Sequence, residues 1–176
     1  MGGEAMNVLS LGAGVQSTVM ALMAAREELT PMPDAAIFAD TGWEPLAIYT
    51  HLNWLSCQLP FPVYHVSAGN LRDDHIKGLN STGQRFASMP LFTSSGGMGR
   101  RQCTNEYKIE PITQKIRRLL GLEKGQRGPK EVATKQWIGI STDEASRMKS
   151  HQSKYIENIF SSSEKSITIL LSFIVG

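Results

Sequence analysis

Short apolar segments alternate with amphipathic segments in the first half of the chain, and this alternation restricts the fold more than any other feature. Residues 5–9, 35–39 and 63–66 are short and mostly apolar, which is typical of strands buried on both faces. Apolar side chains between residues 48 and 59 follow at helical spacing. Strands and helices in this order predict right-handed crossovers. We therefore expect an α/β fold with a Rossmann-like, doubly wound and mostly parallel sheet.

Later segments extend this pattern. We expect a short helix near residues 70–79, a helix over residues 109–119 and a further strand over residues 136–140. A length of 176 residues suits one domain. We assign residues 1–160 to that domain and residues 161–176 to a tail of unknown role.

Residues 10–18, with the sequence S-L-G-A-G-V-Q-S-T, connect the first strand to the first helix. Such a turn directs backbone N–H groups and the positive end of a helix dipole at one point, which suits a phosphate. Gly12 and Gly14 are expected to take positive φ and to let a ligand approach the backbone. The stretch fits neither the G-x-G-x-x-G nor the Walker A pattern. The alternative is an ordinary tight turn without a ligand.

The second predicted strand ends in Asp40, Thr41 and Gly42. Because the carboxyl ends of parallel strands meet at one edge of a sheet, this turn should lie beside the first loop. Asp40 would bind a Mg²⁺ ion or a ribose hydroxyl there. The alternative role for Asp40 is a helix cap.

Basic side chains are concentrated in the middle of the chain. Ten basic and four acidic residues lie between positions 100 and 135, although the whole chain has a net charge of only +2. This imbalance favours an anionic partner such as a nucleotide, a nucleic acid or a sulfate-like group. Arg101 and Lys108 would neutralise oxyanions, and Arg147 would close the site after the last strand. Solvent-exposed loop arginines are the alternative for Arg101.

Cysteine content and hydropathy further restrict the cofactors and the cellular location that we expect. Cys57 and Cys103 are the only cysteines, so no iron–sulfur cluster is expected within one chain. The N-terminus has no secretory pattern, and the apolar run at residues 167–175 is too short to cross a membrane. We therefore expect a cytoplasmic protein with no membrane partner.

Four stretches in order resemble the phosphoadenosine-phosphosulfate (PAPS) reductases and related ATP pyrophosphatases of the adenine nucleotide α-hydrolase superfamily, in particular their phage and bacterial members. Residues 10–18 are similar to the pyrophosphate loop, or PP-loop, S-G-G-x-D-S. Residues 40–45 resemble the D-T-G motif, and residues 101–111 resemble a cysteine followed by K-[VI]-x-P. Residues 138–147 resemble G-[IL]-x-x-x-E-x-x-R.

The resemblance implies binding of ATP or a related adenine nucleotide, with Mg²⁺ as the expected ion. It also implies a transferase or ligase reaction that cleaves at the α-phosphate, releases pyrophosphate and uses a second substrate of unknown identity. The catalytic residues would be Arg101, Lys108 and Arg147, and Asp40 would hold the metal. The nucleotide-binding residues would be Ser10, Gly12, Ala13, Gly14, Gln16, Ser17, Thr18, Asp40, Thr41, Gly42, Gly139 and Ser141.

The chain also departs from the family pattern. Val15 and Gln16 stand where members often have Lys and Asp, and no cysteine follows Cys103. Sulfonucleotide reductases use a cysteine near the C-terminus, so reductase activity is not expected. Two other interpretations stay open: a catalytically weak nucleotide-binding module acting as sensor, sponge or subunit, and a nucleic-acid-associated factor. A homo-oligomer also stays open.

Overall fold

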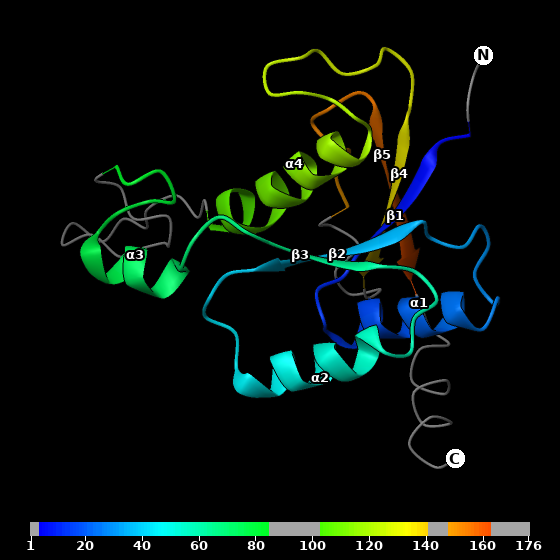
Figure 1. Ribbon diagram of the computed structural model, residues 1–176, viewed down its shortest axis with the longest axis horizontal. Helices are drawn as coiled ribbons and strands as arrows, with labels where there is room; N and C mark the ends of the chain where they lie inside the picture. Colours follow the sequence, from blue (N-terminus) through cyan, green and yellow to red (C-terminus); the bar gives the residue numbers. More distant parts are fainter. Residues whose placement is uncertain (1–3, 85–102, 141–147, 163–176) are drawn as a thin grey trace.

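The computed structural model describes residues 4–84, 103–140 and 148–162. Five parallel strands form one sheet in the order β3-β2-β1-β4-β5 (Figure 1). The strands are β1 (Met6–Ser10), β2 (Ala35–Asp40), β3 (Val63–Ser67), β4 (Thr134–Ile140) and β5 (Ile156–Ser162). The helices are α1 (Val15–Ala25), α2 (Leu46–Ser56), α3 (Leu71–Lys77) and the π-helix η1 (Asn105–Ile109), which continues into α4 (Glu110–Leu119).

The strand order confirms the predicted α/β fold with a doubly wound parallel sheet. The chain runs outward from β1 through β2 to β3, and then returns to place β4 on the other side of β1. The order therefore reverses between β1 and β4, where Ser10 pairs with Ile138. Ligands of open α/β sheets bind outside the carboxyl ends of the strands at such a reversal.

Helices cover both faces of the sheet, and the central strands β1 and β2 are buried along most of their length. α1 and α2 lie on one side and α4 lies on the other (Figure 1). Leu9 and Phe38 belong to the core under α1 and α2, whereas Val8 and Ile37 belong to the core that includes Ile116 of α4. This separation follows from the alternation of side chains along a strand. It also means that Ser10 lies on the α4 side.

The helix predicted near residues 70–79 is present as α3, and its ends have clear local causes. The side chain of Asn70 accepts a hydrogen bond from the Asp73 N–H at 3.0 Å and caps the first turn. Gly78 has φ 66° and ends the helix in the left-handed conformation. Helix α1 ends at Ala25.

Strand β5 is not predicted by the sequence pattern. It pairs with β4 from Ile156 to Ser162, so the predicted domain boundary at residue 160 falls inside a strand. Residues 163–176, which make up most of the predicted tail, lie outside the described residues. Among the described helices, none is long and apolar enough to cross a membrane.

Candidate functional site

The loop between β1 and α1 has one residue in the left-handed conformation, and it is Ala13 rather than a glycine. Ala13 has φ 52°, whereas Gly14, the N-cap of α1, has φ −85° and ψ 174°. Gly12 is likewise outside the left-handed region. The expectation of positive φ at Gly12 and Gly14 is therefore wrong. A left-handed alanine costs roughly 1–2 kcal/mol, which the buried packing of Ala13 has to offset.

Gly14 leaves open space at the first turn of α1. A Cβ built on this residue would meet no atom within 4 Å. Neither the backbone angles nor the packing requires glycine here, since Gly14 is exposed and its φ and ψ suit any residue. Glycine at this position places no side chain in front of the first N–H groups of the helix, which have no partner within the helix. The first turn of α1 carries no acidic side chain that would repel an anion.

The three hydroxyl groups of the loop point to different places. Thr18 is buried, and its Oγ1 lies 2.9 Å from Nε2 of His51, so it joins α1 to α2. Ser17 is also buried and donates to the Gly14 carbonyl at 3.2 Å. Ser10 lines a cavity on the α4 side of the sheet. The structure therefore does not bring the three predicted hydroxyl donors together.

Gly139 is the residue that brings β4 against the loop. A Cβ at this position would lie 2.9 Å from both the carbonyl carbon of Gln16 and the backbone nitrogen of Ser17. These are backbone atoms of the first turn of α1, which cannot move aside as a flexible side chain does. Glycine at 139 is thus required for close packing between the end of β4 and the start of α1.

The Asp40-Thr41-Gly42 turn is held by several hydrogen bonds. Oδ1 of Asp40 accepts from the Gly42 N–H at 2.7 Å and from the Tyr49 hydroxyl at 2.8 Å. The hydrogen bond to Asp40 is the main cause that raises the pKa of Tyr49. Gly42 has φ 69°, which favours glycine. Asp40 does not cap α2, whose N-cap is Pro45 without a side-chain cap.

Asp40 would need further ligands to bind a metal ion. Within the described ranges, no three His, Cys, Asp or Glu side chains lie close enough together to hold an ion. Mg²⁺ is commonly held by one or two carboxylates together with substrate phosphates and waters. Asp40 suits that arrangement, since both of its described hydrogen bonds use Oδ1. Its role in metal binding stays a prediction.

Glu44 links Lys108 to the Asp40 turn. Its Oε1 accepts from Thr41 Oγ1 at 3.1 Å and lies 3.4 Å from Nζ of Lys108. Lys108 belongs to η1, which is distant from the turn in sequence, and its side chain is about half exposed (49%). The structure therefore places this predicted cation beside the carboxyl end of β2.

A cavity of about 370 Å³ adjoins this edge of the sheet on the α4 side. Predicted residues that line it are Ser10, Lys108 and Gly139. Its apolar walls include Ile138 of β4 and Phe160 of β5. The cavity therefore begins at the reversal of strand order, where the fold directs a ligand.

Polar residues of this cavity include several that the sequence reasoning missed: Gln136, Lys149, His151 and Asn158. Gln136 is a buried polar residue in β4, directly before the apolar residues Trp137 and Ile138. A polar residue in such a strand is a signal that could have been used, because buried polar groups need a partner. Lys149 and His151 lie in irregular backbone and leave no comparable pattern.

The hydrogen bonds of His151 fit its neutral form. Its Nδ1 accepts from the Ser153 N–H at 2.9 Å, and its Nε2 lies 3.2 Å from Oγ1 of Thr113. That hydroxyl donates to the Ile109 carbonyl, so Nε2 is the protonated nitrogen. Burial lowers the pKa of His151 below its ordinary value of 6.5.

The shift of His151 predicts a pH dependence of stability. Since its pKa is lower in the folded state, the unfolded state binds more protons as the pH falls below 6.5. The contribution of His151 is present above this pH and is lost below it. The advantage of the native protein over His151→Gln, measured as urea midpoints between about pH 7.5 and pH 5, should shrink with falling pH. A pH-independent difference would contradict this prediction.

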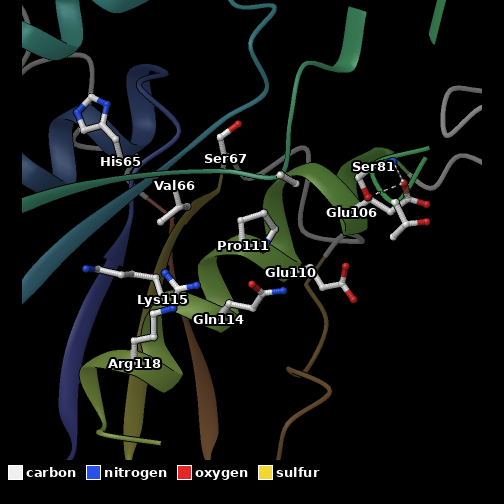
Figure 2. Close-up of a pocket in the computed structure, with 12 residues that line it drawn as sticks. His65, Val66, Ser67, Ser81, Glu106, Glu110, Pro111, Gln114, Lys115 and Arg118 are labelled. Carbon is white, nitrogen blue, oxygen red and sulfur yellow. Dashed lines mark hydrogen bonds between the residues drawn. The ribbon is translucent and has the colours of Figure 1, made fainter. Parts of the chain in front are cut away.

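A second cavity, of about 410 Å³, lies between the end of β3 and α4. Figure 2 shows the basic side chains of Lys115 and Arg118 at one end of it and the carboxylates of Glu106 and Glu110 at the other. None of the predicted site residues in the described part of the chain lines this cavity. The lining of this cavity therefore carries charges of both signs.

Basic residues of the middle segment are partly used within the fold. Nζ of Lys115 lies 3.5 Å from the centre of the Tyr64 ring. Arg117 donates to the carbonyl groups of Glu123, at 3.0 Å, and of Gln126. These side chains stabilise the loop after α4 and the α4–β3 contact, which weakens the case for a continuous basic surface. Arg101, Ser141 and Arg147 lie outside the described residues.

Comparison with solved structures agrees with the predicted fold. The chain is similar to the crystal structure of phosphoadenylyl-sulfate (PAPS) reductase from Candida auris in a phosphate complex, with a TM-score of 0.57 and 13% sequence identity. The match covers 96% of this chain and 73% of that chain. No protein-family model and no curated protein sequence matches the chain. The likeness shows that the chain has a PAPS reductase-like, Rossmann-like fold.

Proposed function

We propose that the protein binds an adenine nucleotide with its phosphates at residues 11–14 and cleaves it at the α-phosphate, releasing pyrophosphate. The observation that carries this proposal is the contact of Gly139 with the first turn of α1. It joins the loop to the end of β4 at the reversal of strand order. Ser10, Lys108 and Gly139 line one cavity at this edge of the sheet, and Gly139 also packs against the start of α1.

The chemistry needs little from the protein beyond positioning and charge. An oxygen of the second substrate attacks the α-phosphorus, a new P–O bond forms, and the bond to the bridging oxygen breaks as pyrophosphate leaves. Backbone N–H groups at the start of α1 hold the leaving group, and Lys108 offsets the negative charge that develops on it. Asp40 would hold Mg²⁺, which screens the phosphates.

Gly14→Ala separates ligand binding from folding. Alanine adopts the φ and ψ of Gly14 without strain, and its methyl group meets no protein atom within 4 Å, so the loss of stability should be limited to about 1 kcal/mol, the usual cost of alanine at an N-cap. The methyl group occupies the space in front of the helix terminus. We expect Mg²⁺–ATP and Mg²⁺–pyrophosphate to bind at least about tenfold more weakly, measured by isothermal titration calorimetry. Unchanged affinity for both ligands would contradict phosphate binding at this loop.

A turnover assay separates the enzyme from a binding module. The protein is incubated with ATP and Mg²⁺, with and without candidate acceptors, and pyrophosphate is measured together with the adenylylated acceptor, or with AMP where water is the acceptor. Gly14→Ala is the matched control. Release that depends on an acceptor and is lost in the variant supports the enzyme. Binding without release under every condition favours the catalytically weak module, and absence of nucleotide binding contradicts both.

A further inference from the structure

Tyr107 has the largest of the fully buried side chains that the structure describes, and its hydroxyl joins two helices. The hydroxyl donates to Oδ2 of Asp74 at 2.7 Å, which connects η1 to α3. Burial is the main cause that raises the pKa of Tyr107 above its ordinary value of 10, and the hydrogen bond to Asp74 adds to it. The hydroxyl is therefore a donor throughout the neutral pH range, and it fixes one point of η1 to α3.

The turn of helix that carries Tyr107 also carries Lys108. Its π-helical form is rare in proteins, occurs mostly as single turns and is often found at functional sites. A second contact holds this turn, because the backbone N–H and the hydroxyl of Ser81 both donate to Oε2 of Glu106 at 3.4 Å (Figure 2). The two residues that directly precede Lys108 are therefore both anchored to other segments of the chain.

Helix α3 is in turn held against the turn at residues 40–42. The N–H of Leu71 donates to the Thr41 carbonyl at 2.8 Å, and Nδ2 of Asn70 donates to the Gly42 carbonyl at 3.3 Å. A Cβ on Gly42 would lie 3.2 Å from Cα of Asn70, so the two segments are in close contact. The start of α3 thus has a fixed position relative to the carboxyl end of β2.

The same turn also holds the partner of Lys108. Oε1 of Glu44 accepts from Oγ1 of Thr41 at 3.1 Å and lies 3.4 Å from Nζ of Lys108. Two paths therefore connect η1 to this turn. One path runs through α3 and Asp74 to Tyr107. The other runs through Glu44 to Lys108, and the two paths meet at adjacent residues of η1.

We infer that Tyr107 is a positioning residue, whose hydrogen bond to Asp74 fixes η1 so that the ammonium of Lys108 stays beside Glu44 at the carboxyl end of β2. Lysine has a long and flexible side chain, so its ammonium is oriented only if the backbone that carries it is fixed. The placement of Lys108 needs no ligand. Its effect on a leaving pyrophosphate rests on the proposed function.

Competitive acylation of the lysines measures the placement of Lys108 in the absence of nucleotide. An ammonium that is paired with a carboxylate is acylated more slowly than a free one. Lys124 is exposed in the loop after α4 and serves as the internal reference. Tyr107→Phe should raise the labelling of Lys108 relative to Lys124 by about two- to fivefold, measured by mass spectrometry on the folded protein. A merely structural role for Tyr107 would lower the urea midpoint and leave this ratio unchanged, and that result would overturn the inference.

Variants of Asp74 test whether the hydrogen bond is responsible. Asp74→Ala removes the acceptor from the partly exposed side of the bond, so it should raise the ratio as Tyr107→Phe does, and it decides the matter if that variant does not fold. Asp74→Asn keeps an acceptor oxygen and should restore the native ratio. A ratio as high in Asp74→Asn as in Asp74→Ala would contradict a role for the hydrogen bond.

Tyr155→Phe is the matched control for Tyr107→Phe. Tyr155 is also buried, and its hydroxyl accepts from Nη1 of Arg117 at 3.3 Å. It directly precedes β5, at the opposite edge of the sheet from Lys108. This variant loses a tyrosine hydroxyl from the fold but should leave the labelling of Lys108 unchanged. Equal labelling in the two tyrosine variants would contradict a specific role for Tyr107.

Turnover tests the consequence for the proposed function. Tyr107→Phe should slow the release of pyrophosphate at saturating Mg²⁺–ATP by about tenfold, because the ammonium is displaced, while the affinity for Mg²⁺–ATP changes by less than about twofold. In the Lys108→Met background it should cause no further loss, since Tyr107 acts through Lys108. A further tenfold loss in that background would overturn the inference. Absence of release by the native protein would contradict the proposed function alone, because the labelling ratio still decides whether Tyr107 positions Lys108.

Discussion

Gly139→Ala is expected to lower the free energy of unfolding by about 1–3 kcal/mol and to abolish measurable nucleotide binding. The added methyl group would lie 2.9 Å from two backbone atoms of Gln16 and Ser17. Relief requires α1 to move away from β4, and this movement displaces the helix terminus that is proposed to bind phosphate. Urea denaturation measures the first effect, and calorimetry with Mg²⁺–ATP measures the second.

Two other glycines of the same site provide controls. Gly12→Ala places its methyl group at ordinary contact distance, 3.9 Å from Oγ of Ser17, and Gly14→Ala meets nothing within 4 Å. Gly12→Ala should retain native stability to within about 0.5 kcal/mol, and Gly14→Ala should lose at most about 1 kcal/mol, because alanine is a poorer N-cap than glycine. If Gly139→Ala proved as stable as these two, the close approach between β4 and α1 would not be what holds the loop in place.

Lys108→Met is expected to slow pyrophosphate release by about 100-fold or more, with little change in stability. The side chain is about half exposed and its ion pair with Glu44 spans 3.4 Å, so losing the pair should cost less than about 1 kcal/mol. Under the proposed function the ammonium stabilises charge on the leaving pyrophosphate, which explains the large effect on rate. Single-turnover release of pyrophosphate at saturating ATP measures it.

Lys115→Met is the matched control for this variant. Lys115 lies in α4, close to Lys108 in the chain, but its Nζ lies over the Tyr64 ring and it lines the other cavity. This variant should keep the rate of pyrophosphate release and lose only a small part of its stability. Equal rates in Lys108→Met and Lys115→Met would remove Lys108 from the site.

The parts of the fold that the sequence predicts well are those with a strong local cause. Residues 35–39 form an uninterrupted apolar run, and the structure has β2 there as Ala35–Asp40, buried along most of its length. Helix α3 has a capping Asn70 and a left-handed Gly78, both of which a sequence pattern can indicate. Strand β5 has no such cause. Glu157 and Asn158 interrupt its apolar residues, and its place is set by pairing with β4.

The sequence pattern predicts which edge of the sheet the candidate site residues share. It does not predict the backbone conformation of the loop or the contacts that its side chains make. Parallel topology alone brings Ser10, Asp40 and Gly139 to one edge of the sheet. Which loop residue takes positive φ depends on how the loop packs, and this residue is Ala13. Whether Thr18 faces a ligand or α2 depends on the position of His51, which is distant in sequence. Such contacts arise from tertiary packing and leave no local pattern.

Glu44 has a further consequence for affinity. Because its carboxylate accepts from Thr41 and pairs with Lys108, it acts as an internal counterion at the edge where a phosphate is proposed to bind. A phosphate that took Lys108 as its partner would exchange one anion for another instead of neutralising an isolated cation. Breaking the Lys108–Glu44 ion pair therefore offsets part of the electrostatic attraction between Lys108 and the phosphate. In return, the Asp40 turn orients the ammonium before the ligand binds.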